Sequence, residues 1–221
     1  MENDLRFLRQ QDAINMMRLA NLGITLIGAG AIGSTTCVWL GKMGVSSVSV
    51  YDADIVQAHN WSSQMYRTCD IKRPKVVALG EVLTEFGCDY LALFNERYVD
   101  QPLSEVVISG VDSMESRKLI WKSVREKPDV KLYLDARMGL ETLVVYAVRP
   151  QIKEDRVLYS ESLCTDAEAL QEPCTARTIC YTPLMAASVL CNLVKRFVNN
   201  EEMPRRVILD LTTFTLMTDM M

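Results

Sequence analysis

Residues 23–33 read GITLIGAGAIG: an aliphatic, β-branched run followed directly by glycines at positions 28, 30 and 33. The run predicts a buried strand over 23–27, and the apolar residues after it predict a helix over 31–43. In such a unit Gly28 allows the tight turn, Gly30 lets a phosphate approach the backbone, and Gly33 lets helix and strand pack closely. The stretch therefore predicts a nucleotide-binding loop at a helix N-terminus. The alternative is a glycine turn needed only for packing.

An acidic residue follows the next predicted strand. Residues 45–51 alternate and are rich in valine, which favours a strand, and Asp52 comes directly after it. An acid at this place in a strand–helix–strand unit accepts a ribose hydroxyl, and we expect this role for Asp52. For Asp54, two residues on, we favour a turn in which the carboxylate bonds its own backbone.

The rest of the chain alternates in the same way. We expect further strands at 90–94, 105–111, 131–136, 141–148 and 206–217, and helices at 2–20, 74–86, 114–125 and 183–198. Residues 151–180 are polar and irregular, which predicts a long crossover loop. The alternation predicts one α/β, Rossmann-like domain over residues 1–221, with an N-terminal helical arm at 1–20. Its sheet would be mostly parallel with helices on both faces, and ligands bind beyond the carboxyl ends of such strands.

Composition narrows the class of protein. Lys plus Arg is 24 and Asp plus Glu is 28, a net charge of −4 that argues against a nucleic-acid partner. No apolar run approaches the roughly 20 residues that span a bilayer, so we expect no membrane partner. The N-terminus lacks the apolar core of a secretory signal, which favours the cytoplasm. The seven cysteines include no C-x-x-C pair, so we expect no structural zinc, and the single histidine, His59, excludes multi-histidine metal sites.

Two further charged groups fall at predicted helix starts. Lys72, Arg73 and Lys75 cluster where cations oppose the helix dipole, so an anion-recruiting role is as reasonable as a solvated face, especially for Lys75. Asp112 ends the strand predicted at 105–111 and lies on the ligand edge of the sheet. With Ser113 it could belong to a helix cap, or it could hold Mg²⁺ together with phosphate oxygens.

These features together resemble the ThiF/MoeB/HesA family, which includes ubiquitin-activating enzymes. The motifs stand in the family's order over about residues 5–198: Gly28 to Gly33, Asp52, Asn60, Gln64, Pro74-Lys75, and Asp112 with Arg117. Arg6 to Gln10 is similar to the family's R-Y-x-R-Q segment. Pro173-Cys174-Thr175 resembles the catalytic-cysteine segment of the ubiquitin-activating branch.

The resemblance implies an ATP- and Mg²⁺-dependent adenylyltransferase that acts as a homodimer on the C-terminal carboxylate of a ubiquitin-like protein or peptide. It implies that the glycine loop holds the phosphates, Asp52 the ribose and Asp112 the Mg²⁺, while Lys75 offsets phosphate charge. Asn60, Ser63 and Gln64 would also bind the nucleotide, and Arg9 would reach the ATP of the partner subunit. The products would be an acyl-adenylate and pyrophosphate.

One family position differs in this chain. The family usually has N-x-x-R-Q, but residues 60–64 are Asn-Trp-Ser-Ser-Gln, so Ser63 replaces an arginine. A hydroxyl still donates a hydrogen bond but carries no charge. Loss of one such electrostatic stabiliser commonly costs about 10²–10³ in rate. Arg67, one helical turn further on if that stretch is helical, could substitute.

Three alternatives stay open at this stage. Cys174 could take the acyl group if Arg177 lowers its pKa, or it could be an ordinary thiol. The same glycine loop would serve an NAD-dependent oxidoreductase, although the chain has no Tyr-x-x-x-Lys pair and only His59 as a histidine proton donor. Ser63 also fits a catalytically weakened dimer partner that supplies only Arg9 to an active relative.

Overall fold

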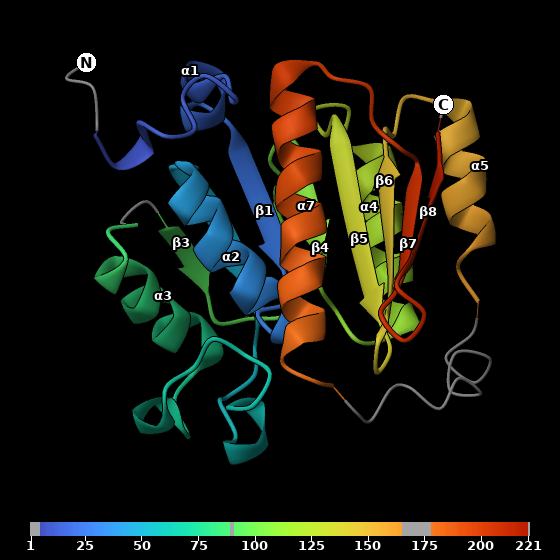
Figure 1. The fold of residues 1–221 in the computed structure, drawn as a ribbon. Helices are drawn as coiled ribbons and strands as arrows, with labels where there is room; N and C mark the ends of the chain where they lie inside the picture. Colours follow the sequence, from blue (N-terminus) through green and yellow to red (C-terminus); the bar gives the residue numbers. More distant parts are fainter. Residues whose placement is uncertain (1–4, 89–90, 165–177, 221) are drawn as a thin grey trace.

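The computed structural model describes residues 5–88, 91–164 and 178–220. Its elements alternate between strands and helices along most of the chain (Figure 1). The strands are β1 Gly23–Ile27, β2 Ser47–Tyr51, β3 Leu91–Phe94, β4 Val106–Ser109, β5 Leu132–Met138, β6 Thr142–Val148, β7 Arg206–Asp210 and β8 Thr215–Asp219. The helices are α1 Met16–Ala20, α2 Ala31–Met43, α3 Lys75–Glu85, α4 Met114–Glu126, α5 Lys153–Glu161 and α7 Tyr181–Asn199, with short 3₁₀ helices η1 Leu5–Phe7, η2 Ala58–Asn60 and η3 Thr68–Asp70.

All eight strands form one sheet in the order β3-β2-β1-β4-β5-β6-β7-β8. Neighbours from β3 to β5 are parallel, and β6, β7 and β8 are added antiparallel. The register sets five residues level with one another across the parallel part: Phe94, Tyr51, Ile27, Ser109 and Asp135. We call this side of the sheet the carboxyl edge, and the opposite side, where β1 to β5 begin, the amino edge. The predicted α/β, Rossmann-like class is confirmed.

Helices cover both faces of the sheet. On one face α2, α3 and α7 bury the larger core, in which α2 packs along α7 (Figure 1). On the other face α4 and α5 bury a smaller, aromatic core, where Trp121, Tyr133 and Tyr159 stack or meet edge to face. Strands that are buried on both faces have continuous apolar sequences, which is why β1 and β4 could be predicted from the sequence.

The helix predicted over residues 2–20 is wrong for most of its described length. Only α1 at Met16–Ala20 is α-helical, and η1 and turns precede it. Asn15 caps α1 by accepting a hydrogen bond from Arg18 N, which ends any helix coming from before it. Asn199, at the end of α7, binds both Asn15 N and Ala13 O at 2.9 Å. These tertiary hydrogen bonds replace the ones that a continuous helix would need.

Two C-terminal predictions are also corrected. The loop predicted over 151–180 contains α5, whose polar sequence hides one buried face formed by Asp155 and Tyr159. The single strand predicted over 206–217 is an antiparallel hairpin of β7 and β8. Asp210 Oδ1 accepts from Thr212 N at 2.9 Å, and Phe214 adopts φ 53°, so the chain turns back between the two strands.

None of the helices in the described ranges has the length and apolar character needed to cross a membrane.

Candidate functional site

The glycine loop connects β1 to α2 at the carboxyl edge. Gly28 adopts φ +91° and donates to Tyr51 O at 2.9 Å, a conformation that side chains rarely allow. A Cβ at Gly33 would lie 1.8 Å from Gly28 O, so this glycine is required for the approach of helix to loop. A Cβ at Gly30 would meet nothing within 4 Å. Gly30 therefore faces open space at the N-terminus of α2.

Another glycine contributes to the loop and had no role in the sequence interpretation. Gly110 follows β4, and its amide donates to Ile27 O at 2.9 Å. A Cβ at Gly110 would lie 3.2 Å from Gly33 N, so β4 and the start of α2 come together through two glycines. The signal was present as a glycine that interrupts the apolar run of residues 106–111.

Asp52 connects the end of β2 to the glycine loop. Its Oδ2 accepts from Ala29 N at 2.7 Å and its Oδ1 accepts from Asp54 N at 2.8 Å. Burial raises the pKa of Asp52, and the charge of Lys75 and the two backbone hydrogen bonds oppose that rise. Each carboxylate oxygen has a second lone pair, so Asp52 can still accept a ribose hydroxyl.

Lys75 and Asp54 form an ion pair beside Asp52. Lys75 is the first residue of α3, is only 7% exposed, and places Nζ 2.9 Å from Asp54 Oδ2. The predicted turn at Asp54 is present, but the carboxylate that accepts its backbone hydrogen bond is that of Asp52. The Asp54 side chain binds Lys75 instead. The buried position of Lys75 distinguishes it from Lys72, which is exposed.

The loop after β2 places Asn60, Ser63 and Gln64 in a short compact turn. Asn60 is buried and its Oδ1 accepts from Gln57 N at 2.8 Å. Ser63 N and Gln64 N both donate to Asn60 O. The Gln64 Oε1 atom is buried and accepts no hydrogen bond from any described residue. An acceptor left in this condition normally has a partner that is supplied by solvent or a ligand.

Two hydrogen bonds attach this loop to the glycine loop and to the first turn of α2, and sequence reasoning missed both. The Tyr66 hydroxyl donates to Ala29 O at 2.6 Å, and Met65 N donates to Ser34 Oγ at 3.1 Å. Tyr66 is buried, so its hydroxyl needs such an acceptor. No spacing rule connects residues 29 and 66, which is why the pair could not be found from the sequence.

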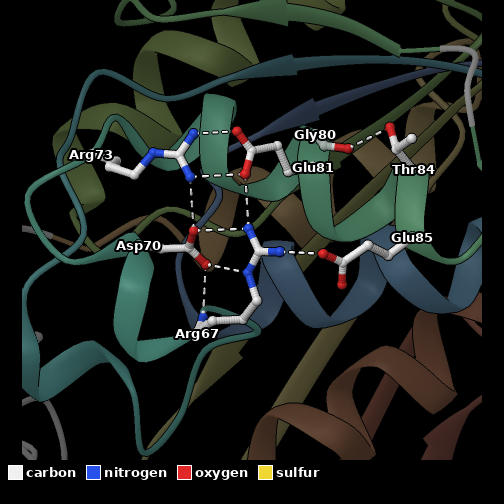
Figure 2. Close-up of polar contacts among 7 residues, drawn as sticks. All are labelled: Arg67, Asp70, Arg73, Gly80, Glu81, Thr84 and Glu85. Carbon is white, nitrogen blue, oxygen red and sulfur yellow. Dashed lines mark hydrogen bonds and ion pairs between the residues drawn. The ribbon is translucent and has the colours of Figure 1, made fainter.

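Arg67 does not substitute for the arginine missing at Ser63. The stretch from 61 to 67 is not helical, and the Arg67 guanidinium binds three carboxylates (Figure 2). It lies 3.0 Å from Asp70 Oδ1 and 2.9 Å from Glu81 Oε2, and it also pairs with Glu85. Arg73 joins the same network through Asp70 and Glu81 (Figure 2). Hydrogen bonds from Arg73 and Arg67 lower the pKa of Glu81 to about 2. Because Glu81 belongs to α3, these ion pairs attach the loop to that helix.

Asp112 follows β4 at the carboxyl edge. It is exposed, and within the described part of the chain no hydrogen bond or ion pair reaches its carboxylate. The helix cap belongs to Ser113, whose side chain accepts from Ser116 N at 3.2 Å. Asp112 is therefore available to a ligand rather than engaged in capping α4.

Arg9 lies far from this edge in its own chain. The neighbouring Gln10 binds Met43 O at 2.9 Å, at the end of α2 opposite the glycine loop. A helix of 13 residues such as α2 is roughly 20 Å long. Arg9, next to Gln10 in the sequence, is exposed. It can contribute to a nucleotide site only in another copy of the chain.

Cys174 and its flanking Pro173 and Thr175 lie outside the described residues. Of the cysteines that are described, Cys37 and Cys191 are buried, and burial raises the pKa of each thiol to about 12. These two are packing residues rather than nucleophiles.

The residues at the carboxyl edge fit a Mg²⁺ nucleotide better than a metal held by protein alone. Over residues 5–88, 91–164 and 178–220, no three His, Cys, Asp or Glu side chains come together as a metal cluster. One free carboxylate, Asp112, matches the preference of Mg²⁺ for one or two carboxylates plus phosphate oxygens. The open space at Gly30 and the unpartnered Gln64 Oε1 leave room and a hydrogen-bond acceptor for the nucleotide.

The fold and this edge define a nucleotide-binding α/β protein of the Rossmann-like class. A sequence model described as the ThiF family matches residues 3–220, and the chain belongs to this family.

Named relatives and solved structures agree with that assignment. The chain is 27% identical over 125 residues to a probable molybdopterin-synthase adenylyltransferase of Porphyra purpurea, covering 52% of this chain and 32% of that protein. It is 27% identical over 134 residues to the sulfur carrier protein ThiS adenylyltransferase of Escherichia coli K12, covering 53% of each. The match thus spans about half or less of these relatives.

Among solved structures, E. coli MccB with ATP has a TM-score of 0.78 at 14% identity, covering 99% of this chain and 72% of that one. PaaA has a TM-score of 0.74 at 15% identity, covering 98% and 69%. These similarities show the fold.

Proposed function

We propose that this protein uses Mg²⁺-ATP to adenylate the C-terminal carboxylate of a ubiquitin-like protein or peptide. A carboxylate oxygen attacks the α-phosphorus, the bond to the bridging oxygen of the β-phosphate breaks, and pyrophosphate leaves with that electron pair. The product is an acyl-adenylate. This reaction needs alignment and neutralised charge but no protein base, which suits a chain whose only histidine, His59, is exposed.

The observation that carries the proposal is the open glycine loop at the carboxyl edge. A Cβ at Gly30 would meet no atom, and Asp52 and Lys75 lie beside the same loop. In our proposal the amides of residues 28–33 hold the phosphates and Asp52 accepts a ribose hydroxyl. Lys75 exchanges its contact with Asp54 for the phosphates. Asn60, Ser63 and Gln64 close the site from the other side.

Asp112 would hold Mg²⁺, which when bound supplies charge neutralisation for the phosphates. Arg9 would act on the site of a second copy, since it lies at the far end of α2 in its own chain. This requires a dimer, which we propose to be a homodimer. Later transfer of the acyl group to Cys174 is a further step of the proposal. We expect these reactions to take place in the cytoplasm.

The named relatives support the substrate class. One is a ThiS adenylyltransferase, ThiS being a sulfur carrier protein, and MccB has been crystallised with ATP and with MccA. Membership of the ThiF family disfavours the NAD-dependent oxidoreductase. Ser63 keeps the weakened dimer partner as the second candidate, because Arg67 is engaged with Asp70, Glu81 and Glu85.

The test has two parts. Calorimetric titration with ATP and with NAD⁺ separates the adenylyltransferase from the oxidoreductase, and we expect heat of binding with ATP alone. Pyrophosphate–ATP exchange with candidate acceptors separates the enzyme from the weakened partner. An intact chain that binds ATP but exchanges no pyrophosphate with any acceptor would favour the weakened partner.

A further inference from the structure

Three aspartates in the described part of the chain are buried and each is bridged by two arginines. One is Asp70, which binds Arg67 and Arg73 in the network of Figure 2, and the other two are Asp135 and Asp155. Asp135 Oδ1 lies 3.2 Å from Arg117 Nε, and its Oδ2 lies 2.7 Å from Arg137 Nε. We call these three residues the Asp135 triad. Asp155 is likewise bridged by Arg149 at 2.7 Å and Arg205 at 2.8 Å, and these form the Asp155 triad. The two triads have the same residue types and the same formal charge.

The triads lie at opposite edges of the sheet. Asp135 is level with Ser109, at the carboxyl edge. Arg149 directly follows β6, whose last residue, Val148, pairs with Tyr133 near the start of β5. Asp155 is in the first turn of α5, close to Arg149. The Asp155 triad is therefore at the amino edge, away from the glycine loop.

The Asp135 triad connects two loops of the carboxyl edge. Arg117 donates a second hydrogen bond to Val111 O, the carbonyl directly before Asp112. Arg137 donates to Ser162 O at 2.9 Å and to Ser162 Oγ at 3.0 Å, at the C-terminal end of α5. The loop that carries Asp112 is thus joined to α5 through one buried carboxylate.

Further charged and aromatic groups contact the Asp135 triad. Burial lowers the pKa of Arg137, but the carboxylate of Asp135 more than offsets this and the pKa is raised, so Arg137 stays charged. Tyr159 donates to Asp135 Oδ2 at 3.0 Å, and Arg137 lies over the Tyr146 ring at 4.6 Å. Buried ion pairs of this kind contribute little net stability, so we look for the role of the triad in the position that it gives to the groups around it.

We infer that the Asp135 triad positions the loop of residues 110–113 so that Asp112 faces bound Mg²⁺-ATP. The inference rests on the proposed function. Arg117, Asp135 and Arg137 are positioning residues, since none of them needs to touch the nucleotide. The Asp155 triad, equally buried and equally charged, has no such role.

The test compares three variants: Asp135→Asn, Arg117→Lys and the control Asp155→Asn. Asparagine keeps the shape but removes the charge, and lysine keeps the charge but cannot bind Asp135 and Val111 O together as a planar guanidinium does. Calorimetry measures ATP affinity with Mg²⁺ and with EDTA, and exchange kinetics give the Mg²⁺ concentration for half-maximal rate. Circular dichroism and the thermal midpoint report whether each variant is folded.

For Asp135→Asn and Arg117→Lys we expect the half-saturating Mg²⁺ concentration to rise about 10–100-fold, as for groups that orient a metal ligand. We expect ATP affinity in EDTA to stay unchanged, because the glycine loop is intact. In Asp155→Asn we expect a lower thermal midpoint with unchanged Mg²⁺ dependence. Arg117→Lys keeps the test decisive if Asp135→Asn does not fold.

Unchanged Mg²⁺ dependence in a folded Asp135→Asn or Arg117→Lys chain would overturn the role of the triad alone. An equal shift in Asp155→Asn would also overturn it, since the effect would then be general loosening of the fold. A wild-type chain that binds no ATP would instead remove the proposed function, and this inference with it.

Discussion

The polar groups at the two edges of the sheet differ in whether they have hydrogen-bond or ion-pair partners. At the amino edge, Asp155 is matched by two arginines, Asp100 by Lys127 and Ser123, and the last carbonyls of α2 by Gln10. At the carboxyl edge, Asp112 has no partner among the described residues. The Gln64 Oε1 atom there is buried without a described donor, and Gly30 faces open space.

This difference is our reason for placing the proposed nucleotide site at the carboxyl edge. Buried or aligned polar groups that lack a partner cost free energy, so most of a fold satisfies them. Where several polar groups in one small region lack a partner, a bound molecule is the simplest source of the missing hydrogen bonds and charges. The amino edge therefore serves as an internal control for each substitution at the carboxyl edge.

The largest effect is expected from Asp112, and a second exposed aspartate, Asp100 at the amino edge, is its matched control. Asp112→Ala should reduce pyrophosphate exchange by about 10²–10³ while the thermal midpoint stays unchanged, since no described group depends on this carboxylate. Asp100→Ala should leave exchange unchanged and lower the midpoint slightly, because Lys127 loses its carboxylate partner at 2.7 Å but keeps its hydrogen bonds to neighbouring oxygens. Full exchange activity in Asp112→Ala would remove Asp112 from the metal site.

Two glycines of the same loop give an intermediate effect. Gly33→Ala places a methyl against Gly28 O and should destabilise the fold by about 1–3 kcal/mol or more, as overpacking does. Gly30→Ala meets no atom, so the fold should survive, but the methyl fills the approach to the backbone amides. We expect ATP to bind at least about tenfold more weakly to Gly30→Ala than to the wild type, which is equivalent to the loss of one hydrogen bond to a charged group. Denaturant unfolding and calorimetry measure the two quantities.

If Gly30→Ala binds ATP as tightly as the wild type, the phosphates do not approach this position and the glycine loop serves packing alone.

The smallest effect concerns the pKa of Asp52. Burial raises this pKa and the charge of Lys75 opposes the rise, so Lys75→Met should raise it further. Loss of Lys75 from the phosphates should weaken ATP binding at every pH. The further loss of affinity as the pH is lowered should begin at a higher pH than in the wild type, because protonation of Asp52 removes an acceptor for the ribose hydroxyl. Carbon-detected NMR titration of the carboxyl group measures the shift directly.

Lys72→Met is the matched control, since Lys72 is exposed and is not among the groups that act on the pKa of Asp52. An equal shift in both variants, or none in Lys75→Met, would show that Lys75 does not act on Asp52.

Local patterns were enough to predict the parallel core of the fold. The apolar run before Gly28, the three glycines and the acid after β2 each depend on nearby residues, and β1, α2 and β2 formed close to the predicted ranges. Elements whose burial depends on distant partners were missed. One example is α5, whose buried side includes Tyr159. That side is buried because Tyr159 packs against Trp121 and Tyr133, which are distant in the sequence.

The same limit applies to the site. Spacing identified Asp52, Lys75 and Asp112 as candidates, but the pairing of Lys75 with Asp54 depends on how α3 returns to the loop after β2. Arg67 is only four residues after Ser63, the position it was expected to substitute for, yet its guanidinium binds Asp70, Glu81 and Glu85. Buried networks such as the Asp135 triad join residues that no local rule connects.

Equilibrium binding of nucleotide to the wild-type chain tests the central claim most directly. Calorimetric titration with ATP in the presence of Mg²⁺ should give saturable binding at one site per chain, weakened when EDTA removes the metal, and NAD⁺ should give none. Saturable binding of NAD⁺ with no heat from ATP would contradict the account.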